Sequence, residues 1–233
     1  MKKVFILIFA LAFLQTIVFA QTDAKDDLYY KRQIQNQRFL YNTTGMFNSI
    51  QKKRPDVLEL YLKDGFDANS TMTGTPALYF AIYNKQPECA KLLLDYKADP
   101  NIKHVKLPVI MFAIYYNQTE IADYLLQKGA DPNVSVPPLA VTLKSSTPLL
   151  FAISKKNPDI VKSLIQHNAD VNLEAGGVKP LDYAISKRQI RIAQSLLEAG
   201  AIPDKKTLSL AQKTKDEYLK KLVEEKTKNN YEQ

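Results

Sequence analysis

Apolar residues recur along the chain in two alternating patterns that share one period. The first pattern is a triplet of an aromatic residue, alanine and isoleucine, and its alanines are separated by 32, 39 and 32 residues. The second pattern follows each triplet and has the spacing i, i+1, i+4, i+5, which places its members on one face of a helix. The triplets are Phe80-Ala81-Ile82, Phe112-Ala113-Ile114, Phe151-Ala152-Ile153 and Tyr183-Ala184-Ile185. The second pattern comprises Cys89/Ala90 with Leu93/Leu94, Ile121/Ala122 with Leu125/Leu126, Ile160/Val161 with Leu164/Ile165, and Ile192/Ala193 with Leu196/Leu197.

Each period therefore predicts two short helices. Proline or threonine, followed by an acid, marks the start of the second helix at Pro55, Pro87, Thr119 and Pro158. Proline suits the first helical position, and an acid suits the positive end of the helix dipole. The second helix is predicted to end at Gly65, Gly129, Asn168 and Gly200, residues that tolerate a left-handed C-cap. Lys97 stands at the corresponding position of the second period and departs from this rule.

An asparagine closes each period. Asn69, Asn101, Asn133 and Asn172 are spaced by 32, 32 and 39 residues, so seven extra residues fall between Asn133 and Ala152. An aspartate lies two residues before each asparagine, and its recurrence at the repeat period indicates a structural turn residue. We expect the side chains of Asn69 and Asn133 to serve these turns.

These motifs resemble the ankyrin repeat family, whose unit of about 33 residues carries a Thr-Pro-Leu-His-x-Ala motif and a Gly-Ala-Asp-x-Asn ending. The matching segments include Ser146-Thr147-Pro148-Leu149-Leu150-Phe151-Ala152 and Gly129-Ala130-Asp131-Pro132-Asn133. The family's histidine is replaced by Tyr79, Met111, Leu150 and Asp182, and three loops are one residue shorter than usual. The resemblance implies an all-α ankyrin-repeat solenoid of helix-turn-helix units, with short finger loops and helical caps at both ends. The expected parts are an N-terminal cap at 21–42, repeats at 43–73, 74–105, 106–144, 145–176 and 177–204, and a C-terminal cap and tail at 205–233.

The first twenty residues have the pattern of a signal peptide. Lys2 and Lys3 precede an apolar run, and Val18 and Ala20 place small side chains before a predicted cleavage after Ala20. The alternative is an uncleaved anchor, because Val4 to Ala20 is at the short limit for spanning a bilayer. The pattern predicts a periplasmic or secreted protein with no stable membrane span after cleavage.

The composition limits which kinds of binding or catalytic site the chain can form. The net charge of +8 falls to +6 without Lys2 and Lys3, which is less than the concentrated basic face that nucleic-acid binding requires. One cysteine and two histidines provide no zinc-ligand set, so neither a metal nor a cofactor is expected. Cys89 occupies an apolar position of an outer helix and is expected to be buried. His167 is expected to be exposed at a helix end. Without a phosphate loop or a nucleophile elbow, no catalytic residue is assigned and the chain is predicted not to be an enzyme.

The resemblance implies binding of a partner protein through the concave face that the fingers and first helices form. Carried over by position, the expected contacts are Tyr83, Asn84, Lys103, His104, Lys106, Tyr115, Tyr116, Lys155 and Lys187. The finger residues Lys103, His104 and Lys106 are expected beside the tyrosines, and the protein is expected to be a monomer. Two alternatives are an anionic envelope polymer bound by the lysine-rich half and a solvated groove with no dedicated ligand. The insertion within 134–146 is either a binding finger or a lid packed on its own repeat.

Overall fold

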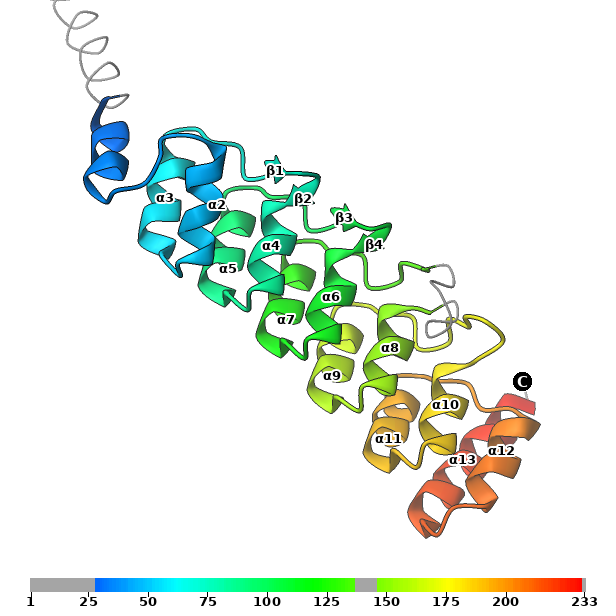
Figure 1. Ribbon diagram of the computed structural model, residues 1–233. Coiled ribbons are helices and arrows are strands. Elements are labelled where there is room, and N and C mark those ends of the chain that lie inside the picture. The colour runs from blue at the N-terminus through cyan, green and yellow to red at the C-terminus, as the bar shows by residue number, and fades with distance from the viewer. Residues whose placement is uncertain (1–27, 137–145, 232–233) are drawn as a thin grey trace, which may run out of the picture. The chain divides into compact units, whose positions relative to one another are not determined.

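Most of the chain lies in consecutive helix pairs (Figure 1). The computed structural model describes residues 28–136 and 146–231, so the predicted signal segment and most of the predicted insertion lie outside the described residues. The chain divides into two compact units between Ala98 and Asp99. We call their described parts the N-terminal unit (28–98) and the C-terminal unit (99–136 and 146–231).

The N-terminal unit begins with helical residues 28–36 and continues with two helix pairs. A two-residue hairpin connects the pairs, and Ile34 and Phe39 are buried near the start of the unit. The elements are α2 (Thr43–Gln51), α3 (Pro55–Lys63), β1 (Thr71–Met72), β2 (Thr75–Pro76), α4 (Ala77–Tyr83) and α5 (Pro87–Asp95).

The C-terminal unit contains three helix pairs of the same kind and a final pair that forms a cap. The first helices α6, α8, α10 and α12 pack in succession, and the second helices α7, α9, α11 and α13 do the same. The elements are β3 (Lys103–His104), β4 (Leu107–Pro108), α6 (Val109–Tyr115), α7 (Thr119–Gln127), α8 (Pro148–Ser154), α9 (Pro158–Gln166), α10 (Pro180–Ser186), α11 (Ile190–Glu198), α12 (Lys205–Gln212) and α13 (Glu217–Tyr231).

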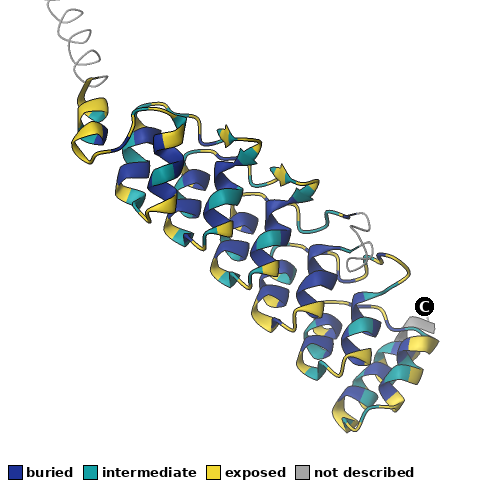
Figure 2. Ribbon diagram, in the orientation of Figure 1, coloured by how far each residue is buried: buried dark blue, intermediate teal, exposed yellow. Residues whose placement is uncertain are grey.

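The predicted apolar patterns form the core (Figure 2). The alanines of the four triplets are all fully buried, which lets neighbouring first helices approach closely. The i, i+1, i+4, i+5 positions of the second helices are buried as well, apart from the half-buried Ile165. The helix positions predicted from the period are therefore confirmed.

The turns after the second helices use aspartate and asparagine differently. Each aspartate accepts a hydrogen bond from the backbone N–H of the asparagine two residues later, at 2.8 Å in all four turns. The asparagine amides instead bridge to the next repeat: Asn101 Nδ2 donates to Gly129 O (2.9 Å), and Asn101 Oδ1 accepts from Asp131 N (2.8 Å). Asn172 bonds Gly200 O and Ile202 N in the same way. The aspartates are turn residues as predicted. The expectation that Asn69 and Asn133 serve their own turns was wrong, because the amide of Asn69 donates to Lys97 O and that of Asn133 to Asn168 O in the following repeat.

Left-handed residues end the helices of both rows. The second helices are followed by Gly65, Lys97, Gly129, Asn168 and Gly200, all with positive φ, so Lys97 adopts the conformation of its glycine counterparts with φ 66°. The first helices are followed by a second left-handed series that the sequence did not reveal. These residues are Lys53, Lys85, Asn117, Lys156 and Arg188, with φ between 53° and 58°.

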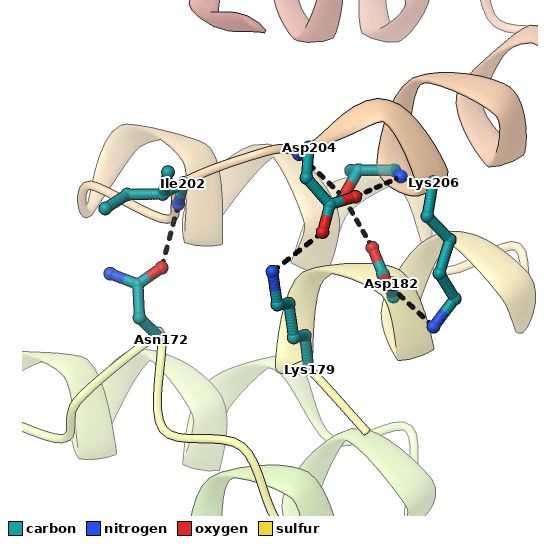
Figure 3. A network of polar contacts seen from close by, with 7 residues as sticks. Asn172, Lys179, Asp182, Ile202, Asp204 and Lys206 are labelled. Atoms are coloured by element: carbon teal, nitrogen blue, oxygen red, sulfur yellow. Dashed lines mark hydrogen bonds and ion pairs between the residues drawn. The ribbon is translucent and has the colours of Figure 1, made fainter. Parts of the chain in front are cut away.

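The cap is attached through a polar network at the start of α12 (Figure 3). Asp182, which replaces the family's histidine, is buried in α10 and accepts a hydrogen bond from Thr207 Oγ1 (2.6 Å). Lys206 Nζ lies 3.1 Å from the other oxygen of Asp182. Asp204 caps α12 by accepting from Thr207 N (2.9 Å), and Lys179 Nζ donates to it (2.7 Å).

Candidate functional site

Aromatic rings and lysines alternate along the first helices of the C-terminal unit. Lys155 Nζ lies 4.2 Å from the ring centroid of Tyr115 in α6 and 5.7 Å from that of Phe151, one turn earlier in α8. Lys187, the residue after α10, repeats the second of these contacts, with Nζ 5.4 Å from the ring of Tyr183 in its own helix. Such contacts are worth about 0.5–1 kcal/mol at exposed positions, so they orient the ammonium groups without removing them from water.

Two tyrosines lie side by side at the end of α6. Tyr115 is 54% exposed, and the half-buried Tyr116 packs edge-on against it with ring centroids 5.1 Å apart. A shallow cleft of about 420 Å³ opens beside Tyr115 and is also lined by Lys155 and Asn157. Asn157 is buried, and two hydrogen bonds fix its amide: Nδ2 donates to Asn117 Oδ1 at 2.6 Å, and Oδ1 accepts from Ile160 N at 2.9 Å. Tyr115 itself contacts the Tyr116 ring and the Lys155 ammonium and leaves about half of its surface available to another molecule.

The finger between β3 and β4 lies at the opposite end of α6. Lys103, Lys106 and the intervening Val105 are exposed, and the His104 ring lies 6.2 Å from that of Phe112. The finger precedes the first residue of α6, whereas Tyr115 is its last residue, so about 10 Å of helix separates them. The expectation that the finger residues lie directly beside the tyrosines was therefore wrong, since a seven-residue helix stands between the two groups.

The N-terminal unit contributes its own tyrosines. Tyr83 is 55% exposed at the end of α4, and its ring lies 5.9 Å from that of Tyr79. Asn84 is half-buried, and its Nδ2 donates to Phe80 O at 2.8 Å. The amide of Asn84 thus binds a carbonyl at the end of its own helix, while Tyr83 offers the larger contact surface.

Among the predicted contacts, the structure brings Tyr115, Tyr116 and Lys155 together. Lys187 follows on the next first helix of the same unit, and Lys103, His104 and Lys106 form the separate finger. Sequence reasoning did not select Asn157, which supports the cleft. The signal available for it was weak, because an asparagine before Pro158 reads equally well as a helix N-cap, which it also is.

The groups that carry catalysis in other proteins have structural roles here. Cys89 is 1% exposed, and burial raises the pKa of its thiol to about 12, as expected for an apolar substitute. Ser163 Oγ donates to the Asp123 carboxylate, and His167 Nε2 lies 3.5 Å from the same oxygen. The aspartate stands between the other two, so this trio lacks the serine–histidine contact of a nucleophilic triad. His167 is half-buried rather than exposed, because Asp123 of the preceding repeat covers it.

Within 28–136 and 146–231, no three His, Cys, Asp or Glu side chains gather as metal ligands would. No helix in those ranges combines the length and apolar character needed to cross a bilayer.

Comparison with known proteins identifies the family. The model for ankyrin repeats in three copies matches residues 16–104, 46–136 and 110–207. The chain therefore belongs to the ankyrin repeat family, whose repeats are protein–protein interaction modules. A solved structure with the same fold is the ankyrin repeat domain of human ASB11, with a TM-score of 0.57 and 20% identity over 78% of this chain and 82% of that one. A comparison with curated protein sequences found no match.

Proposed function

We propose that the chain is an exported, monomeric ankyrin repeat protein that binds a partner protein through the first-helix face of its C-terminal unit. The supporting observation is the exposed Tyr115, which packs against the Tyr116 ring and has Lys155 Nζ 4.2 Å from its ring centroid. Tyrosine supplies a large contact area with little loss of side-chain entropy, and exposed aromatic anchors dominate the energy of many protein interfaces. The protein acts by binding rather than by catalysis.

A second candidate is binding of an anionic envelope polymer, and the turns after the first helices favour it. Lys155, Lys156, Lys187 and Arg188 are exposed at two consecutive turns of the C-terminal unit. A row of cations attracts a polyanion, and the attraction weakens steeply with salt. A protein partner anchored on Tyr115 depends less on salt, because burial of an aromatic ring is not screened.

Quantitative capture from an envelope extract tests the first proposal. Wild-type protein is compared with the double variant Tyr115→Ala/Tyr116→Ala and with the matched variant Tyr218→Ala, which removes an exposed tyrosine from α13. A partner of the proposed face is retained by the Tyr218 variant and weakened by about 2 kcal/mol or more in the double variant. The double variant must keep its thermal transition. Undiminished capture would move the site elsewhere, and binding that vanishes between about 0.05 and 0.2 M salt would favour the polymer.

Export is a separate part of the proposal and rests on residues 1–20. Protein isolated from the cell envelope or the medium is expected to begin at Gln21. N-terminal sequencing tests this expectation, and a full-length chain retained by the membrane would replace the signal peptide with an anchor.

A further inference from the structure

A second surface lies at the junction of the last repeat and the C-terminal cap. A groove of about 610 Å³ runs between the α10–α11 turn and the α12–α13 turn. Its apolar part is formed by Ile185, Ile190 and Leu210, of which Ile190 and Leu210 are half-buried. A concave apolar surface bounded by polar side chains is typical of a binding site.

The rim of this groove is basic. Arg188, Lys213 and Lys215 line it and are exposed, and none of the three forms an ion pair with another described residue. Arg188 has a left-handed backbone in the turn between α10 and α11, while the two lysines come from the turn between α12 and α13. Cations from two elements therefore face one apolar groove, so the groove complements a ligand that carries both negative charge and an apolar group.

Asp216 in the groove disfavours a ligand that is negatively charged along its whole length. Asp216 lines the groove, and its Oδ1 accepts a hydrogen bond from Leu219 N at 2.7 Å, which fixes the carboxylate at the start of α13. A uniformly anionic polymer would meet this fixed negative charge and leave the apolar part uncovered. A peptide can avoid both penalties, because it can place an aliphatic side chain on Leu210, acids beside the cations and a backbone N–H beside Asp216.

We propose that this groove binds an acidic peptide segment with a central aliphatic residue. The site is independent of the tyrosine face and goes beyond the function proposed above. Because Arg188 and the two lysines are exposed, each contact is modest, and we expect weak, reversible binding of the kind that recruits a flexible segment of a protein.

Fluorescence anisotropy with a synthetic peptide tests the proposal. The probe is a short fluorescein-labelled peptide in which acidic pairs flank one leucine, and its control carries serine in place of leucine. At about 0.15 M salt the leucine peptide is expected to bind the mature protein at least about fivefold more tightly than the serine peptide. The variant Arg188→Asn/Lys213→Gln should weaken binding about tenfold, and asparagine suits the left-handed backbone at 188.

The control variant Lys162→Gln/Lys221→Gln removes the same charge from exposed positions outside the groove and should change binding less than about twofold. Tyr115→Ala/Tyr116→Ala should leave peptide binding unchanged, so that failure of this site and failure of the tyrosine face remain distinguishable. Four results overturn the proposal: no binding to the wild-type protein, equal loss in the control variant, equal binding of the two peptides, or tighter binding of inorganic polyphosphate than of the leucine peptide. The comparison of the two peptides uses wild-type protein and holds even if a variant fails to fold.

Discussion

At the scale of single residues, the left-handed position after each second helix shows how backbone conformation affects stability independently of side-chain packing. Lys97 adopts φ 66° there, and its backbone makes the bonds that its glycine counterparts make: Lys97 N donates to Leu94 O (3.1 Å), and Ala98 N donates to Leu93 O (2.9 Å). A residue with a Cβ is strained in this conformation by about 1 kcal/mol relative to glycine. The lysine therefore reduces stability at a position where the hydrogen bonds are already complete.

Lys97→Gly is expected to raise the free energy of unfolding by about 1 kcal/mol, because it removes this strain. The reciprocal change Gly129→Ala, at φ 95° with no atom within 4 Å of the added Cβ, should lower it by a similar amount. Urea titration of both variants measures the effect. A Lys97→Gly variant that is no more stable than wild type would show that the lysine side chain contributes more than its backbone costs.

Cys89 provides a second test at this scale. Burial raises the pKa of the thiol to about 12, so the native protein should react slowly with a thiol reagent at neutral pH and rapidly once urea unfolds it. Cys89→Val should keep the free energy of unfolding within about 1.5 kcal/mol, since the two side chains have similar volumes. Fast labelling in native buffer would contradict the burial.

Whether the sequence predicted a left-handed backbone depended on the type of residue at the position. Gly65, Gly129 and Gly200 carry an explicit signal for a left-handed backbone, and the prediction there was confirmed. In the series after the first helices, Asn117 is of a type that favours positive φ, but the other four residues are lysine or arginine, which do not. Lys85 and Arg188 adopt it because a short turn must reverse the chain between two packed helices.

At the scale of elements, the two hairpins use the same turn with different residues. Thr73 and Gly74 have φ 51° and 77°, whereas Val105 and Lys106 have φ 51° and 66°. A two-residue hairpin with positive φ at both positions favours asparagine and glycine, and a β-branched residue there is unfavourable. The β3–β4 finger thus keeps two poorly suited residues, both of which project their side chains into solvent.

Lys106→Gly is expected to stabilise the protein by about 0.5–1 kcal/mol, because glycine adopts this turn without strain. The same variant measures what Lys106 does for binding. If the finger contacts the partner, capture weakens while the thermal midpoint rises. A variant that is stabilised and binds as wild type does would remove Lys106 from the binding surface.

The start of α12 makes the stability of the cap dependent on pH. The Lys179 ammonium, followed by the Thr207 backbone N–H, holds the pKa of Asp204 well below its usual range. A carboxylate whose pKa is lower in the folded than in the unfolded state stabilises the fold above the unfolded pKa of about 3.9 and loses this contribution as the pH falls below it. The contribution is therefore complete at pH 7.

Asp204→Ala should lower the free energy of unfolding by about 1 kcal/mol at pH 7, the usual cost of removing an N-cap. The difference between the variant and wild type should shrink as the pH falls below about 4, because Asp204 then takes up a proton in the unfolded chain before it does so in the folded protein. Thermal melts across this range provide the measurement. A difference that does not change with pH would mean that the charge of Asp204 contributes nothing.

At the scale of the whole molecule, the repeat period predicted which residues share a face but not which side chains meet across repeats. The period alone placed Tyr115 and Lys155 on first helices. The contact between Lys155 and the Tyr115 ring depends on how α6 and α8 pack, which no spacing within one repeat contains. The same holds for Asn101, whose amide reaches a carbonyl 28 residues away, although the asparagines themselves were visible as a period.

Because the contacts of each repeat depend on its neighbours, the effect of a core substitution on stability should depend on its place in the array. Leu164 in α9 and Leu219 in α13 are both fully buried, but α9 packs against second helices on both sides, whereas α13 ends the row. In a repeat array, stability is a sum of repeat and nearest-neighbour terms, so damage at the end remains local. Leu164→Ala should lower the free energy of the main unfolding transition by about 2–5 kcal/mol.

Leu219→Ala creates a similar cavity, but the cap can unfold alone and limit the loss. Hydrogen exchange should then increase in α12 and α13 while the main transition shifts by less than half of the Leu164→Ala effect. Conservative Leu219→Met serves as the control and should leave exchange in the cap nearly unchanged. If both alanine variants shifted the main transition equally, the cap would be part of a single cooperative unit. In that case the groove between the α10–α11 turn and the cap would be lost only on global unfolding.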